Sequence, residues 1–120
     1  MQGKRLERVS ELIKQSLSHN ILTKVRDTRL GFVTITEVRV SADLSSARVY
    51  YSVMGNEKVK RSTEVALKQA RGFLQRELSS EIKIRVTPTL SFHFDPSLQY
   101  GMKIENILQK IRDEETPQGS

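Results

Sequence analysis

Two stretches of β-branched residues, close together in the chain, most constrain what it can fold into. Residues 32–40 and 47–54 alternate apolar and polar side chains, as strands with one buried face do. Only residues 41–46 separate them, and so short a connection favours antiparallel pairing. We therefore predict a β-hairpin whose second strand buries one row of side chains and leaves the other row polar.

The alternation in the first of these stretches slips midway. Val33 and Ile35 share one phase, whereas Val38 and Val40 share the other. One extra residue near Thr36 would restore the pattern, and such an insertion is a β-bulge. We therefore expect a bulge at this point, which lets both halves of the strand bury their apolar side chains.

Helical periodicity flanks the hairpin on both sides. Apolar residues recur at helical spacing in residues 5–20 and again in residues 58–69. The second pattern continues beyond Ala70, Arg71 and Gly72. Because a glycine inside a helix costs about 1 kcal/mol relative to alanine, we expect a kink or a tight helix–helix turn at this tripeptide.

A third strand is predicted at residues 89–95, where apolar and polar residues alternate again. A last helix, capped by Ser97, is predicted from an apolar stripe that ends at Ile111. The order is then helix, strand, strand, helix, helix, strand and a terminal helix. This order predicts an α+β domain, with one three-stranded sheet and the helices packed on one face.

The 120 residues suffice for one domain with one core. We expect that domain to span residues 1–112, followed by a disordered acidic tail at residues 113–120. The chain has no cysteine, which excludes disulfides and thiol chemistry. It has no apolar signal core at its N-terminus and no apolar run near the roughly 18 residues of a membrane span. We expect it in the bacterial cytoplasm, away from membranes.

Residues for catalysis are scarce. A serine nucleophile needs a base, usually histidine, and His19 and His93 fall at a helix end and within a strand. Asp27, Asp43 and Asp95 lie at the ends of elements, where aspartate usually stabilises a turn. Glycine-rich phosphate loops and metal-ligand clusters are missing from the sequence. We therefore expect no enzyme activity, no metal and no cofactor.

The net charge of +6 is concentrated on particular elements. Residues 58–86 carry eight basic residues against three acidic ones, and the first 26 residues carry six against two. Such concentration is expected of a surface that binds RNA phosphates. The alternative is that these are ordinary solvated helix faces, as the pairing of Glu64 with Lys68 four positions later would suggest.

The candidate RNA-binding residues are mostly basic and surround the predicted helix break. They are Arg5, Arg8, Arg29, Lys60, Arg61, Lys68, Ala70, Arg71, Gly72, Arg76, Lys83 and Arg85. A helix that began at Gly72 would expose unpaired N–H groups, which bind anions. A residue without a side chain would also let a phosphate backbone approach closely.

Exposed aromatic residues are expected to be few. Core positions suit Phe32, Tyr51, Phe73, Phe92 and Phe94, which leaves Tyr50 and Tyr100 undecided. Base stacking on an aromatic sheet is then not expected. We expect recognition of RNA shape and backbone, with weak sequence specificity.

Several short segments in a fixed order resemble one known family. They are Arg8-Val9, Asp27-Thr28-Arg29-Leu30-Gly31, Val38-x-Val40-Ser41-x-Asp43-Leu44, Ala47-x-Val49-Tyr50, Ala70-Arg71-Gly72-Phe73, Arg85-x-x-Pro88-x-Leu90-x-Phe92 and Asp95-x-Ser97-x-x-x-Gly101. In their order and spacing, over residues 5–111, the chain resembles the ribosome-binding factor A family. It departs at Thr28, where the family usually has proline.

The resemblance implies a type II KH-like fold in which Ala70-x-Gly72 replaces the GxxG loop that ordinary KH domains use to clamp single strands. It also implies binding of the free 30S subunit and 16S rRNA, assistance in late 30S maturation and 16S rRNA processing, often at low temperature, and cooperation with other assembly factors such as GTPases. Nothing in the sequence demands a dimer. A KH-like RNA-binding protein of another pathway and a protein–protein adaptor stay open as alternatives.

Overall fold

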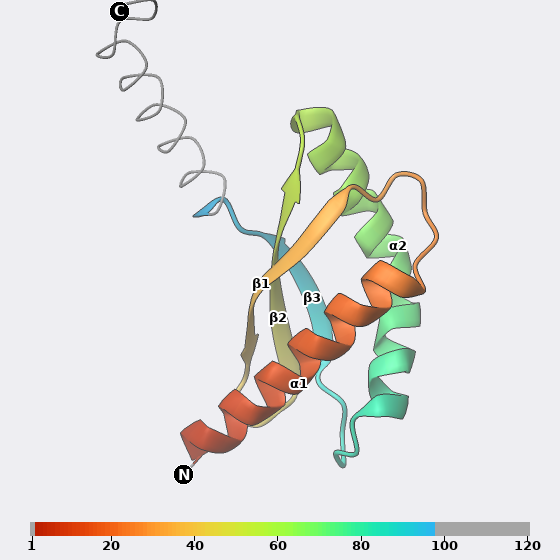
Figure 1. Ribbon diagram of the computed structural model, residues 1–120. Coiled ribbons are helices and arrows are strands. Elements are labelled where there is room, and N and C mark those ends of the chain that lie inside the picture. The colour runs from red at the N-terminus through yellow and green to blue at the C-terminus, as the bar shows by residue number, and fades with distance from the viewer. Residues whose placement is uncertain (1, 98–120) are drawn as a thin grey trace, which may run out of the picture.

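The chain, described by a computed structural model over residues 2–97, folds as a sheet with helices on one face (Figure 1). The elements in order are α1 (Gln2–Thr23), β1 (Phe32–Val40), β2 (Ser46–Met54), α2 (Glu57–Glu81) and β3 (Thr89–Phe94). The strand order is β1-β2-β3. The predicted α+β class with a three-stranded sheet is confirmed. Neither helix is long and apolar enough to cross a membrane.

The predicted hairpin and its bulge are both confirmed. β1 and β2 pair antiparallel from Phe32↔Met54 to Val40↔Ala47, and the register slips between Ile35 and Glu37. β3 joins the other side of β2 in parallel. β1 and β3 are therefore the edge strands, and β2 is the central strand of the sheet.

The predicted helix–helix turn at residues 70–72 is wrong. α2 is one helix of 25 residues that begins at the cap of Asn56, whose Oδ1 accepts a hydrogen bond from the Val59 amide, and passes through Gly72 without ending. The residues before and after Gly72 bury the same face, because Leu67, Leu74 and Leu78 are all fully buried. Burial of two leucines stabilises the helix by more than the roughly 1 kcal/mol that one glycine costs.

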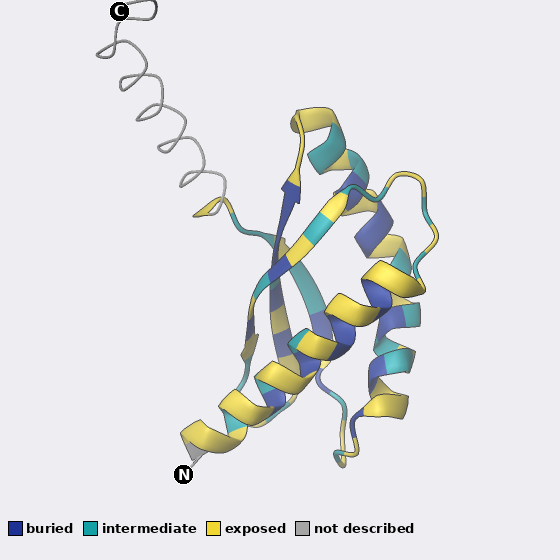
Figure 2. Ribbon diagram, in the orientation of Figure 1, coloured by how far each residue is buried: buried dark blue, intermediate teal, exposed yellow. Residues whose placement is uncertain are grey.

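One core lies between the sheet and the two helices (Figure 2). α1 contributes its buried stripe of Val9, Ile13 and Leu17, and β2 contributes Val49 and other residues of the same phase. Of the aromatics expected in the core, Tyr51 is buried, and Phe73, Phe92 and Phe94 are half-buried against it.

Phe32 was expected in the core and is instead 69% exposed. It begins β1, one residue out of phase with Val33 and Ile35, so it points to the opposite side of the sheet. The predicted strands and helices up to residue 97 otherwise agree with the structure to within a few residues. The predicted helix that ends at Ile111 and the tail at residues 113–120 lie outside the described residues.

Candidate nucleic-acid interface

The solvent-facing side of α2 is a continuous basic surface. Its members follow one another at helical spacing, and all are exposed. We call this surface the outer face of α2: Lys58, Arg61, Val65, Lys68, Arg71, Gly72 and Arg76. Within residues 2–97, Lys58, Arg61, Arg71 and Arg76 form no ion pair. Their charges are thus available to an anionic partner.

The acidic residues in the second half of α2 face α1 instead. The Glu77 carboxylate lies 2.8 Å from Lys24 Nζ, and this bond raises the pKa of Lys24. The Glu81 carboxylate accepts hydrogen bonds from Ser16 and Asn20, which lower its pKa. Charge is therefore segregated across the helix, with anions in the seam between helices and cations on the outer face.

The first half of α2 carries two acids, which reduce the positive charge of the outer face only slightly. Glu64 lies 3.8 Å from Lys68, and both side chains are more than half exposed. Exposed pairs of this kind contribute little and are screened by salt. Glu57 binds Lys60 at 3.0 Å, at the side of the helix toward β3.

Gly72 lies on the outer face without any structural need for glycine. A Cβ added there would meet only Arg76 Nη1, at 3.5 Å, which is ordinary contact. A Cβ added to Gly31, by contrast, would come within 2.8 Å of Val53 and Val59. Gly55 is the one glycine in residues 2–97 with positive φ. Neither packing nor backbone conformation accounts for the glycine at position 72.

The anion site expected from free N–H groups at Gly72 is wrong, because the helix does not begin there. The amides of residues 70–72 lie inside the continuous hydrogen-bonded helix, where each is already paired. Any anion at Gly72 would meet a flat, side-chain-free stretch of helix flanked by cations.

Three other predicted residues have contacts within the protein. Ala70 is half-buried and packs on the core. The Lys60 ammonium lies 5.0 Å from the centre of the Phe94 ring, besides its ion pair. Arg29 binds both oxygens of Asp27, at 3.0 and 2.7 Å, and also Gln69 on α2. These bonds lower the pKa of Asp27 to about 2, so Arg29 fixes the α1–β1 loop against α2.

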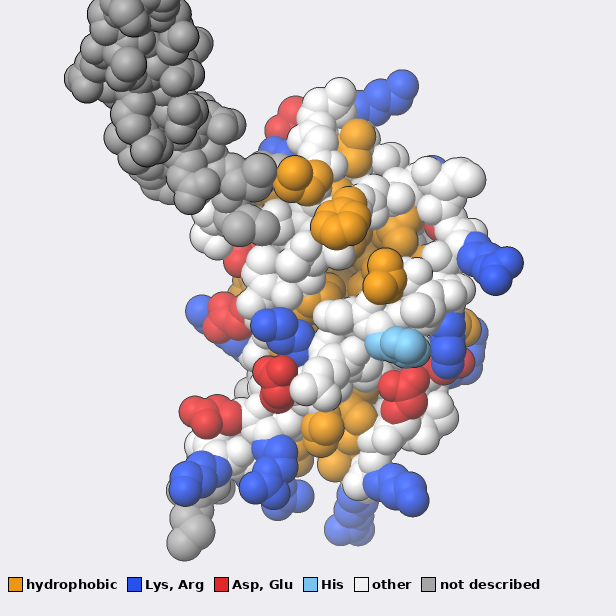
Figure 3. Space-filling model, in the orientation of Figure 1, with side chains coloured by type: hydrophobic (Ala, Val, Ile, Leu, Met, Phe, Trp, Pro, Cys, Tyr) orange, Lys and Arg blue, Asp and Glu red, His pale blue; other side chains and the backbone are white. Residues whose placement is uncertain are grey.

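The remaining predicted residues gather at one end of the molecule. Arg5 and Arg8 line a hollow of about 850 Å³ together with Ile84, which stands between Lys83 and Arg85 in the loop after α2. We call Lys4, Arg5, Arg8, Lys83 and Arg85 the basic end. Figure 3 shows Lys and Arg side chains gathered at the lower end of the molecule, around the start of α1.

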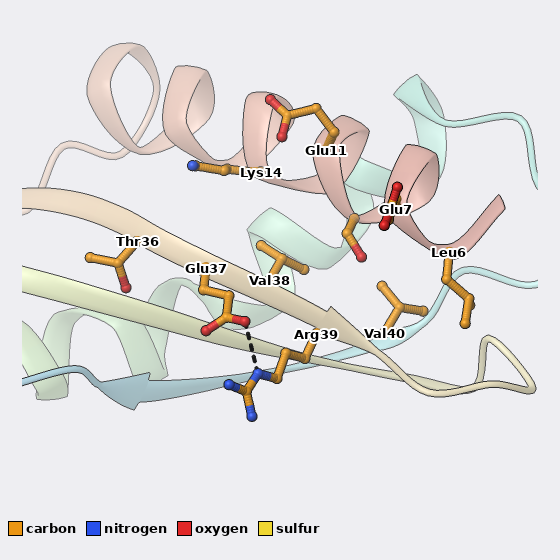
Figure 4. Close-up of a pocket in the computed structure, with 10 residues that line it drawn as sticks. Leu6, Glu7, Glu11, Lys14, Thr36, Glu37, Val38, Arg39 and Val40 are labelled. Atoms are coloured by element: carbon orange, nitrogen blue, oxygen red, sulfur yellow. Dashed lines mark hydrogen bonds and ion pairs between the residues drawn. The ribbon is translucent and has the colours of Figure 1, made fainter. Parts of the chain in front are cut away.

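The sheet face opposite the helices is the polar row that the alternation of β2 predicts, but none of the predicted RNA-binding residues lies on it. Tyr50 lies there, with its ring centre 5.6 Å from that of His93 on β3 and 5.5 Å from the Arg39 guanidinium on β1. Figure 4 shows Glu37 and Arg39 on the side of β1 away from α1, joined by an ion pair of 2.9 Å. The alternation of β2 predicts this position, with Tyr50 on the polar row opposite Tyr51, and the burial of Tyr51 confirms it.

The hollow between α1 and β1 does not fit RNA. It has a volume of about 560 Å³, and α1 lines it with two acids, Glu7 and Glu11, against one base, Lys14. Within residues 2–97 no group of three His, Asp or Glu side chains could hold a metal ion. The basic surfaces are therefore the stronger candidates for the functional site.

The fold and the exposed basic helix define a small α+β domain of the KH-like class. The chain belongs to the ribosome-binding factor A family, since the family model described as "Ribosome-binding factor A" matches residues 5–108. A protein of that name from Staphylococcus carnosus is 47% identical over 111 residues, which are 92% of this chain and 96% of that relative.

Structural similarity supports the same assignment. The crystal structure of ribosome-binding factor A from Thermus thermophilus matches with a TM-score of 0.65 and 27% identity, over 73% of this chain and 93% of that one. A homology model of the Thermus thermophilus factor, fitted into a cryo-EM map of a 30S complex, matches with a TM-score of 0.60 and 28% identity, over 71% of this chain and 89% of that one.

Proposed function

We propose that the protein binds the free, immature 30S subunit through its 16S rRNA, assists late maturation and 16S rRNA processing, and then leaves. The observation that carries this proposal is the outer face of α2, where Arg61, Arg71 and Arg76 have no ion pair among residues 2–97. Family membership points the same way, as does the similar Thermus thermophilus protein that was fitted into a 30S complex.

The outer face suits a folded RNA backbone rather than a chosen sequence. Its cations are spaced along a helix, and each can neutralise one phosphate and release a counterion. Gly72 lies among them and leaves room for a sugar–phosphate chain to approach the helix backbone. The basic end extends the positive surface beyond α2, with Arg5, Arg8, Lys83 and Arg85 as further phosphate contacts.

The protein acts by binding and not by catalysis, as a monomer in the bacterial cytoplasm. The only two histidines lie apart, His19 near the end of α1 and His93 on β3. The alternatives, an RNA-binding protein of another pathway and a protein–protein adaptor, do not account as well for the segregation of charge across α2.

Sedimentation of cell extracts tests the partner. The protein is expected to migrate with free 30S subunits and to be absent from 70S ribosomes. A profile confined to the top of the gradient would contradict the proposal and favour one of the alternatives.

A pair of matched variants tests the surface. Arg71→Gln with Arg76→Gln lowers the net charge from +6 by two, and so does Gln15→Glu with Ser18→Glu on α1. All four side chains are exposed. The α2 variant is expected to bind purified 30S subunits roughly 10- to 100-fold more weakly near 0.1 M salt, from two lost phosphate contacts. Equal losses in both variants would mean that only net charge matters.

A further inference from the structure

The open face of the sheet carries a row of planar side chains, one from each strand. Tyr50 on β2 lies opposite His93 on β3, and Arg39 on β1 reaches it diagonally, so that the Tyr50 ring centre is 5.6 Å from the His93 ring centre and 5.5 Å from the Arg39 guanidinium. The pairing register explains the row, because Tyr50 lies opposite His93 and beside the β1 bulge. Tyr50 is half-exposed, while Arg39 and His93 are exposed.

Polar contacts orient the two outer members of the row. The Arg39 guanidinium is held by the Glu37 carboxylate at 2.9 Å. The His93 Nε2 lies 3.0 Å from the Ser91 hydroxyl. The Arg39–Glu37 pair is about half exposed and contributes little energy, but both contacts favour an arrangement in which the flat groups lie side by side, as stacking of a flat ligand requires.

Charge on this face favours an anionic ligand. Arg48 lies opposite Arg39 on one side and Ser91 on the other, next to the row, and has no ion pair within residues 2–97. Two acids lie near the row, and both are engaged: Glu37 pairs with Arg39, and Asp95 accepts a hydrogen bond from the Thr36 hydroxyl at 2.7 Å. Planar groups beside an unpaired arginine match the chemistry of a nucleotide, which combines a flat base with a phosphate.

We propose that the open sheet face binds an unpaired nucleotide of RNA, with its base stacked against Tyr50 and its phosphate bound by Arg48. This inference rests on the proposed function, since it takes RNA as the ligand, but it concerns a surface separate from the outer face of α2. The two apolar exposed residues of the sheet, Phe32 and Met54, pair with each other at its far end and leave the row polar.

The contrasting explanation is that Tyr50 and His93 only stabilise the sheet as a cross-strand pair. Tyr50→Leu and Tyr50→Phe separate the two. Leucine fills space but cannot stack as an aromatic ring, whereas phenylalanine keeps the ring and loses only the hydroxyl. Tyr50→Leu is expected to weaken binding of a fluorescent single-stranded decaadenylate about 5- to 100-fold, and Tyr50→Phe to change it less than about twofold.

Arg48→Gln provides a second variant that does not depend on the folding of Tyr50→Leu, because Arg48 is exposed. It is expected to reduce the slope of log affinity against log salt for the decaadenylate by about 0.7, the value for one phosphate of a single strand. Binding of the same oligonucleotide that is unchanged in both Tyr50→Leu and Arg48→Gln would overturn the inference. An equal loss in Tyr50→Leu and Tyr50→Phe would also overturn it, since the ring would then not matter.

The two proposals fail in different ways. If the wild-type protein does not bind 30S subunits, the proposed function fails. If 30S binding responds to Arg71→Gln with Arg76→Gln while decaadenylate binding ignores Tyr50 and Arg48, only the sheet-face inference fails.

Discussion

The outer face of α2 and the open sheet face lie on opposite sides of the molecule and differ in chemistry. The helix face bears long, solvated cations around Gly72 and no aromatic residue. The sheet face bears flat side chains held across three strands around Tyr50. The first suits the phosphate backbone of a folded RNA and the second suits a single exposed base. A domain with one core can thus offer RNA two kinds of contact at once.

The difference follows from the elements themselves. A helix spaces its exposed residues around a curved surface, so long side chains such as Arg61 and Arg76 spread into solvent. A sheet places residues of adjacent strands about 5 Å apart on one plane, so Arg39, Tyr50 and His93 come into contact. Binding on both faces would place the protein between two segments of rRNA.

The largest effect is expected when both faces are changed. The variant with Arg71→Gln, Arg76→Gln and Tyr50→Leu is expected to lose about 50- to 10 000-fold in 30S affinity, the product of the separate losses, because distant independent contacts add in free energy. Competition binding against labelled wild-type protein measures it. A combined loss no larger than that of the α2 variant alone would show that the two faces do not bind the same subunit together.

The salt dependence of binding distinguishes the two faces more clearly than the affinity at one salt concentration does. Arg71→Gln with Arg76→Gln is expected to lower the slope of log affinity against log salt by about 1.4 to 1.8, since two phosphate contacts are lost. Tyr50→Leu is expected to leave the slope unchanged, because stacking releases no counterions. Titrations of 30S binding between about 50 and 200 mM salt give both slopes. Equal slopes for the two variants would contradict the distinction between the faces.

Gly72→Ala is expected to change stability and binding in opposite directions. An alanine fits without a clash, since its Cβ would meet only Arg76 Nη1 at 3.5 Å, and it should stabilise the helix by roughly 0.5–1 kcal/mol. The methyl group should weaken 30S binding by a few-fold if the RNA backbone contacts the helix there. Thermal unfolding and 30S binding are measured on the same sample. Higher stability with unchanged 30S affinity would show that the RNA does not contact the helix at Gly72.

The smallest effect on binding is expected from the hairpin turn that supports the sheet. Asp43 accepts hydrogen bonds from Ser41 and Ser45, and these lower its pKa to about 2 from 3.8. Its contribution to stability is therefore complete above about pH 4 and is lost as the pH falls through 2. Asp43→Ala should lower the melting temperature more at pH 7 than at pH 2, with 30S affinity unchanged at neutral pH. A deficit as large at pH 2 as at pH 7 would contradict this origin.

Local patterns predicted most of the fold. The bulge beside Thr36 followed from the alternation of apolar residues alone. Side chains alternate between the two faces of a strand, so a slip in the apolar pattern requires one extra residue at that point. The predicted break at Gly72 was wrong. The low helix propensity of glycine favoured a break, but the burial of Leu74 and Leu78 stabilises the helix by more, and that burial depends on tertiary contacts. The family itself was correctly recognised from the order of its short segments.

The candidate site was harder to predict. The basic residues of α2 could be named from charge alone, but which of them face outward depends on the position of α1, which engages Glu77 and Glu81. The meeting of Arg8 with the loop around Ile84 depends on tertiary packing across more than 70 residues of chain. The alternation of β2 predicted that Tyr50 faces away from the core, because its neighbour Tyr51 follows the buried phase, but not that Arg39 and His93 lie beside it.

Directed cleavage of 16S rRNA tests the central claim most directly. The chain has no cysteine, so one cysteine can carry a tethered iron chelate at a chosen position: Val65→Cys on the outer face of α2, Thr89→Cys on the open sheet face, or Ser18→Cys on α1 as the control. All three positions are exposed. In complexes with 30S subunits we expect strong rRNA cleavage from position 65, a separate set of cuts from position 89, and weak cleavage from position 18. Cleavage from position 18 as strong as that from position 65 would contradict the claim that α2 presents the RNA-binding surface.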